Sequence, residues 1–289
     1  MAWDSTNCQL AIAPNSWSKG NGTSNQNTGN FPTFPNGDFQ NAVLTNMAAG
    51  YGYVYNGGDG YLNLDGNNDY LALGGIPSCL DASSAFTMEF WWWQNTVDVR
   101  NIYSGVYKDA NNHIYVETDT AGNGIMRMNL ATGSAKDAGW NYVDAGYVAG
   151  TWMYQAWVFD GGGATDVDKI KLYVGSPNIA FGQKTFDSLT GSWPATTFDI
   201  TGETILFPGY SVISLDGKIG WCALYNEAIT EARAAANYAL GRDMGLIGTN
   251  TAGVMALASP SVGQLIQHSG MDGLGNYQFN NKMNGGFNA

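Results

Sequence analysis

The chain has little charge, and this shortage excludes two classes of partner. Charged residues make up 12% of its 289 residues, about half the usual share, and the formal net charge is −12. Nucleic acids and anionic membranes attract proteins through basic patches, so we expect neither as a partner. No run of about 18 apolar residues is present, so we expect no membrane insertion.

Cysteine is scarce as well, and so is any sign of secretion. Cys8, Cys79 and Cys222 are an odd and widely spaced set, which argues against a disulfide framework. Cys79 and Cys222 lie in apolar contexts, where we expect buried thiols. The N-terminus lacks the basic and apolar regions of a signal peptide, so we expect a chain made in the cytoplasm, or a trimmed one.

Glycine, asparagine and apolar residues are abundant instead. Hydrophobic residues make up 44% and glycine 39 residues, a composition that favours many short strands joined by turns. From Phe86 to Trp93 the apolar residues recur with a period of two, which predicts a strand with one buried face. Because Trp91 and Trp93 are large and apolar, we expect the other face of this strand to be covered too.

Similar strand patterns recur along the chain, and one helix pattern follows them. The expected strands lie at 43–45, 51–55, 62–64, 70–73, 101–107, 114–118, 125–130, 152–159, 169–174, 204–207 and 217–225. This spacing predicts a sandwich or barrel rather than a parallel sheet. Residues 230–241 are alanine-rich, with Thr230 placed to cap a helix and Gly241 placed to end it. The expected core includes Phe90, Trp92, Trp157, Leu172 and Ile219.

The two ends of the chain differ from its middle. Residues 1–40 are an asparagine- and glycine-rich N-terminal arm, 41–245 form the folded domain, and 246–289 are a C-terminal extension. Both ends have too little apolar pattern to fold alone, so they are either flexible or ordered against neighbouring subunits in an oligomeric assembly. Their apolar anchors are Trp3, Trp17, Phe31, Phe34, Phe39, Leu265, Ile266 and Phe287.

Five segments carry a family resemblance, in order. They are Leu64–Leu71, Phe86–Trp91, Gly150–Gly161, Lys171–Gly175 and Leu215–Thr230. Together they resemble the signatures of laminin-G-like domains within the concanavalin A-like lectin and glucanase jelly rolls. The resemblance implies an all-β, two-sheet antiparallel sandwich with one C-terminal helix. Domains of this kind that lack signal peptides and carry such extensions resemble bacteriophage virion proteins.

Catalytic residues are few. His113 and His268 are the two histidines, and no serine or cysteine stands in a triad-like pattern with them. Some concanavalin A-like folds are glycoside hydrolases with a Glu-x-Asp-x-x-Glu strand. Here Glu117 and Asp119 match its first half, but Gly122 replaces the second Glu, and retaining glycosidases need two close carboxylates. We therefore expect solvent-facing polar residues on this strand, and no enzyme.

Two acidic loops and three aromatic residues are the remaining candidate sites. Asp160, Asp166 and Asp168 lie in one loop, and residues 65–69 contain Asp65, Asn67, Asn68 and Asp69. Neither makes a contiguous calcium loop, so we expect ordinary turns, no metal and no cofactor. The aromatic residues expected to be exposed in loops, where they could stack on sugars, are Trp140, Tyr142 and Trp193.

Three functions remain open. The first is a structural protein of a virion, such as a bacteriophage capsid decoration, fibre or tail component, which docks on other virion subunits and can contact host glycans. The second is a carbohydrate-binding adhesion module at a cell surface or in a secreted protein. The third is a glycoside hydrolase. The first is preferred by analogy with the resembled family.

Overall fold

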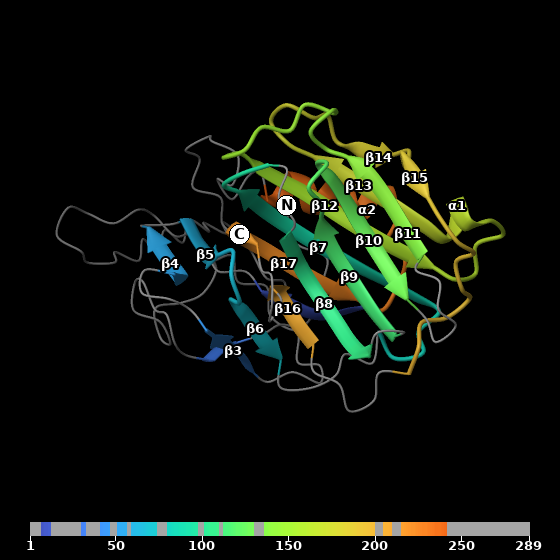
Figure 1. The fold of residues 1–289 in the computed structure, drawn as a ribbon, viewed down its shortest axis with the longest axis horizontal. Helices are drawn as coiled ribbons and strands as arrows, with labels where there is room; N and C mark the ends of the chain where they lie inside the picture. Colours follow the sequence, from blue (N-terminus) through green and yellow to red (C-terminus); the bar gives the residue numbers. More distant parts are fainter. Residues whose placement is uncertain are drawn as a thin grey trace, which may run out of the picture.

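The chain folds into two stacked antiparallel β-sheets, as predicted. The computed structural model describes residues 7–12, 30–32, 41–46, 51–56, 59–73, 80–97, 101–109, 112–129, 136–199, 205–209 and 215–241. Figure 1 shows the two layers, with β8 to β11 of one sheet crossing over β7, β12 and β13 of the other.

Sheet A is built around the tryptophan-rich strand β7. Its strands, in spatial order, are β14 (Gly182–Lys184), β13 (Ile170–Gly175), β12 (Trp152–Asp160), β7 (Ala85–Gln94), β17 (Asp216–Tyr225), β5 (Asp59–Asp65) and β4 (Gly52–Asn56). A further strand, β1 (Cys8–Ile12), pairs with the second half of β17. Every neighbouring pair is antiparallel.

Sheet B covers the inner face of sheet A. Its order is β15 (Ser188–Leu189), β11 (Lys136–Asn141), β10 (Asn123–Asn129), β9 (Asn112–Thr118), β8 (Asn101–Asp109), β16 (Ile205–Gly209), β6 (Tyr70–Leu73), β3 (Asn41–Thr45) and β2 (Asn30–Pro32). A tight turn at residues 66–69 takes the chain from β5 in sheet A to β6 in sheet B. The predicted turn is therefore a corner between the two layers.

The main core lies between the sheets and confirms the predicted buried face. Phe90, Trp92, Trp157, Leu172 and Ile219 are all fully buried in it. Alternate residues of β7, β12 and β17 reach this space because side chains on a strand point to opposite faces in turn. Cys222 is buried in the same cluster, as expected for an unreactive thiol, whereas Cys79 lies outside the described residues.

A second core covers part of the outer face of sheet A. Helix α2 (Glu231–Gly241) packs there, close to its predicted bounds. Thr230 caps it by accepting a hydrogen bond from the Arg233 amide at 3.3 Å. The helix ends at Gly241, where a Cβ atom would lie 2.0 Å from Trp91 Nε1. Glycine is therefore needed for the helix to approach the sheet this closely.

Two segments of the predicted N-terminal arm belong to the sheets. Strand β1 pairs with β17, with Cys8 opposite Tyr225, and β2 pairs with β3. Cys8 is 3% exposed, in the second core. The rest of residues 1–40 and all of 246–289 lie outside the described residues, so the predicted docking of these segments stays a prediction. Among the described helices, none is long and apolar enough to cross a membrane.

A candidate carbohydrate-binding surface

A row of half-buried side chains crosses the outer face of sheet A beyond α2. Antiparallel pairing places Trp152 on β12 opposite Trp93 on β7, Trp93 opposite Lys218 on β17, and Lys218 opposite Asn63 on β5. Tyr61 lies two residues from Asn63 on the same face. All five side chains are partly exposed. We call these five residues the Trp93 surface.

The expectation that both Trp91 and Trp93 are covered is half right. Trp91 is fully buried and stacks on Tyr238 of α2, with ring centroids 5.4 Å apart. Trp93, the next residue on that face, is only half-buried. Gly241, the last described residue of the helix, packs against Trp91. Trp93, at the end of this face of β7, is therefore partly in contact with solvent.

Aromatic contacts fix the arrangement of this surface. The Trp93 and Trp152 rings meet edge to face, with centroids 5.8 Å apart. The Lys218 Nζ atom lies 4.3 Å from the centroid of Trp93 and 4.9 Å from that of Tyr61. Edge-to-face packing and cation–π contacts of this kind are favourable, so the rings are held in place before any ligand arrives.

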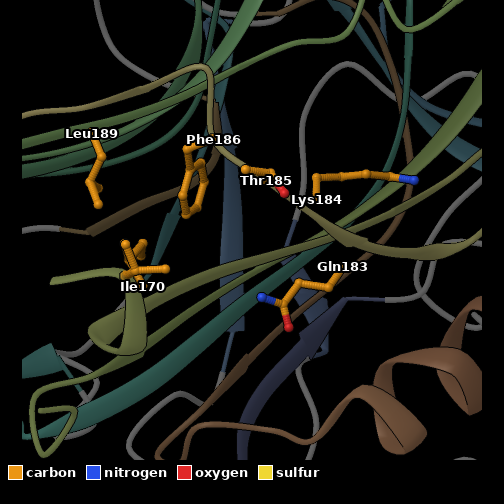
Figure 2. A pocket seen from close by; sticks show the side chains of 7 residues that line it. Ile170, Gln183, Lys184, Thr185, Phe186 and Leu189 are labelled. Atoms are coloured by element: carbon orange, nitrogen blue, oxygen red, sulfur yellow. The ribbon is translucent and has the colours of Figure 1, made fainter. Parts of the chain in front are cut away.

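A hollow of about 360 Å³ opens where edge strand β14 of sheet A approaches edge strand β15 of sheet B. Figure 2 shows Ile170, Phe186 and Leu189 gathered on one side of it, while the Lys184 side chain extends away from them. Lys184 Nζ donates to the Ala180 carbonyl at 2.8 Å. The Phe186 ring stacks on buried Trp157, so one of its faces is already occupied.

The three aromatic residues predicted to be exposed for sugar stacking are not exposed. Trp140, Tyr142 and Trp193 are 7%, 0% and 2% exposed, and all three belong to the main core. Trp140 lies on β11 rather than in a loop. The prediction was wrong because the polar residues and glycines around these positions are typical of loop sequences, whereas burial is determined by tertiary packing.

The expectation that Glu117 faces solvent is also wrong. Glu117 is 2% exposed and lies 3.1 Å from Arg127 Nη1, while Asp137 accepts two hydrogen bonds from the same guanidinium, at 2.8 and 3.0 Å. These partners raise the pKa of Arg127, the Asp137 hydrogen bond most strongly. Asp119 instead orders the β9–β10 turn, since its Oδ1 accepts from the Asn123 amide at 2.9 Å.

The histidine that the structure describes belongs to the packing of the same sheet. His113 is 9% exposed and its ring stacks on Tyr115, with centroids 4.6 Å apart. His268 lies outside the described residues. The face of sheet B around Glu117 and Arg127 is thus occupied by contacts within the protein.

The acidic loops are turns and caps. Asp65 Oδ1 accepts from the Asn67 amide at 2.9 Å, and Asp69 Oδ2 accepts from the Asp65 amide at 2.7 Å. Burial raises the pKa of Asp69, and the nearby Asp65 charge raises it further. Within the described ranges no group of three or more His, Cys, Asp or Glu side chains could hold a metal ion.

The second acidic loop contains a short helix that the sequence analysis did not predict. Helix α1 (Asp166–Lys169) is capped by Thr165, and Asp168 completes the capping box. Asp160 Oδ1 accepts from the Gly162 amide at 3.1 Å, and Asp166 Oδ1 accepts from the Trp193 amide at 2.8 Å. Each of these three carboxylates therefore accepts a hydrogen bond from within the protein.

One buried acid lies beneath α2. Glu89 is fully buried on the outer face of β7 and accepts from Tyr154 Oη at 2.5 Å and from Tyr225 Oη at 2.9 Å. Asn237 Nδ2 donates to both of its carboxylate oxygens at 3.0 Å. Burial raises the pKa of Glu89 to about 7, although the three donors and Arg233 oppose this effect. Because α2 closes over it, Glu89 has no access to a ligand.

Sequence reasoning missed the Trp93 surface. Trp152 and Trp93 were both predicted to lie on strands, and the face of Trp93 was expected to be covered. A sequence signal for such a surface would be aromatic residues near the ends of several strands, each on the face that points away from the core. Only the strand order β12–β7–β17–β5 brings those ends together.

Comparisons with known proteins support the fold. Neither protein-family models nor curated proteins give a match. Among solved structures, domain 4 of AbnA, a GH43 extracellular arabinanase from Geobacillus stearothermophilus in complex with arabinotriose, is similar with a TM-score of 0.53 at 14% identity. That match covers 80% of this chain and 97% of the other.

Two further solved structures match with lower TM-scores. The Ruminococcus gnavus IT-sialidase CBM40 bound to alpha2,3 sialyllactose has a TM-score of 0.43 at 13% identity, covering 61% of this chain and 95% of the other. The binding domain of botulinum neurotoxin DC in complex with SialylT has a TM-score of 0.45 at 11% identity, covering 69% and 46%. Together with the described sheets, the arabinanase match shows the fold. It is a two-sheet antiparallel β-sandwich.

Proposed function

We propose that this protein is a carbohydrate-binding module and that the Trp93 surface is its binding site. The observation that carries the proposal is the group of partly exposed aromatic side chains, Trp93, Trp152 and Tyr61, held on one rigid sheet face. A sugar ring offers a face of C–H groups to an aromatic ring and hydroxyls to polar groups, and Asn63 supplies such a polar group beside the rings.

The size of the surface favours an oligosaccharide. The row from Trp152 to Asn63 crosses four neighbouring strands, and three inter-strand spacings amount to roughly 14 Å. It is flanked by the turn before β12, where Gly150 donates its amide to the Gln94 carbonyl at 2.9 Å and Val148 is 53% exposed. Because these elements are hydrogen-bonded to the sheet, little ordering is needed on binding.

An oligosaccharide ligand also appears in the name of the arabinanase domain to which this chain is similar. The arabinanase domain was solved with arabinotriose, and this agrees with the proposal without assigning that sugar here. The hollow between β14 and β15 is the competing site. Among its described lining residues Phe186 is the single aromatic one, beside Val167, Ile170 and Leu189, so it offers fewer rings for stacking than the Trp93 surface.

The virion role preferred from the sequence is compatible with glycan binding, because a virion fibre can contact host glycans. It depends on residues 1–40 and 246–289, most of which lie outside the described residues. It therefore stays a prediction, as does the absence of enzymatic activity. The observations on the described domain favour the carbohydrate-binding alternative.

A glycan array with neutral and acidic oligosaccharides tests the proposal, followed by calorimetry with the sugars that bind. We expect Trp93→Leu and Trp152→Leu each to weaken binding by roughly tenfold or more, as loss of a stacking side chain does at a binding centre. Phe186→Leu in the hollow is the matched control and should bind as the unchanged protein does. Absence of binding to any sugar, or loss of binding only in Phe186→Leu, would overturn the proposal.

A further inference from the structure

The Trp93 surface contains a cation with an unusual set of neighbours. Lys218 lies in the middle of the row, between Trp93 on one side and Asn63 on the other. Its ammonium contacts the faces of Trp93 and Tyr61. Partial burial lowers the pKa of Lys218, because leaving water disfavours the charged form.

Three other cations of the described domain have oxygen partners. Arg127 pairs with Asp137 and Glu117, and Arg233 pairs with Glu227. Lys169 Nζ donates to the Trp193 carbonyl at 2.6 Å. For Lys218, by contrast, no described carboxylate or carbonyl oxygen makes an ion pair or hydrogen bond, and the two aromatic faces are its neighbours.

Nearby acids do not neutralise this cation. Asp216 lies two residues before Lys218 on β17, and its Oδ1 accepts from Asn95 Nδ2 at 2.8 Å. Asp216 pairs in register with Asp65 at the end of β5. These acids lie toward the strand ends. An anion is therefore repelled from that direction and is best placed over the row itself, between Lys218 and Trp152.

We propose that the Trp93 surface selects glycans that carry a carboxylate, such as uronic or sialic acid residues, with Lys218 as the counter-ion. This inference rests on the proposed function. The sugar ring packs on Trp93 or Trp152 while its carboxylate meets the Lys218 ammonium. The aliphatic stem of Lys218 can stay on the aromatic faces as the ammonium turns to the ligand. Because the whole chain has a net charge of −12, this local cation is what permits an anionic ligand to bind.

Matched pairs of sugars separate the carboxylate from the rest of the ligand. The first pair is an oligosaccharide that ends in glucuronic acid and the same oligosaccharide with that carboxyl group reduced to the alcohol. The second pair is sialyllactose and lactose. Titration calorimetry with the full chain measures the ratio of affinities within each pair, at low and at high salt.

The unchanged protein should prefer the acidic member of at least one pair by roughly fivefold or more, the scale of a partly exposed ion pair. Lys218→Met keeps an apolar stem but no charge, so it should bring the ratio of affinities within each pair close to one, whatever its effect on the affinity for the neutral member. Lys218→Arg should retain the preference. High salt should reduce the preference in the unchanged protein and in Lys218→Arg, because screening acts on the charge pair.

These measurements distinguish failure of the inference about Lys218 from failure of the proposed function. If the neutral sugars bind as well as the acidic ones, the inference is wrong and the proposed function stands. If the acidic preference survives in Lys218→Met, another cation is responsible and the inference is wrong. If no sugar of either kind binds, both proposals are wrong.

Discussion

Replacing Glu89 by glutamine should remove a pH dependence of stability that originates beneath α2. The Glu89 carboxyl is fully buried and its pKa is raised by burial from 4.5 to about 7. Between these values the folded protein holds a proton that the unfolded chain releases, so the free energy of unfolding falls as pH rises from about 4.5 to about 7. The fall attributable to this group is about 3 kcal/mol.

Urea titrations followed by tryptophan fluorescence, at several pH values between about 4.5 and about 8.5, give the free energy of unfolding of both proteins. The glutamine side chain in Glu89→Gln cannot titrate, so the difference between variant and unchanged protein should shift in favour of the variant by about 3 kcal/mol across this range. The substitution also alters the hydrogen bonds to Tyr154, Tyr225 and Asn237. Because this cost does not change with pH, it does not affect the pH dependence of the difference. Parallel pH profiles for the two proteins would refute the reasoning.

Two further changes test the packing. Trp157→Ala should lower the free energy of unfolding by about 3–5 kcal/mol, because its side chain is fully buried in the main core; a variant with an unchanged urea midpoint would contradict this packing. Gly241→Ala should lower the melting temperature, since its Cβ would lie 2.0 Å from Trp91 Nε1. Gly182→Ala, whose nearest neighbour is 3.9 Å away, is the matched control, and equal effects of the two changes would show that α2 does not need its close approach.

The fold could be predicted where local pattern and burial agree. The alternation of Phe86, Met88, Phe90 and Trp92 identified the central strand and its inner face, because side chains on a strand point to opposite faces in turn. The Thr230 cap and the Gly241 stop placed α2 almost to the residue. Such signals depend only on neighbours in the sequence.

The surface that we propose for binding could not be predicted in the same way. Trp152, Trp93 and Lys218 meet only because β12, β7 and β17 are adjacent, and periodicity does not determine strand order. The burial of Glu117 likewise depends on Arg127 from the neighbouring strand. Trp93 and Trp91 look equivalent in the sequence, but it is Trp91 that Tyr238 and Gly241 of the distant helix α2 pack against.

The position of β17 has a consequence for synthesis of the chain. This strand lies between β7 and β5, yet residues 95–215 separate it from β7 in the sequence. At roughly 5–20 residues per second the ribosome needs about 6–24 seconds to add them. During that interval the edge of β7 that later pairs with β17 has no partner there, and it carries three consecutive tryptophans. The nascent chain therefore exposes this tryptophan-rich strand edge until β17 has been made, a natural point for a chaperone to engage it.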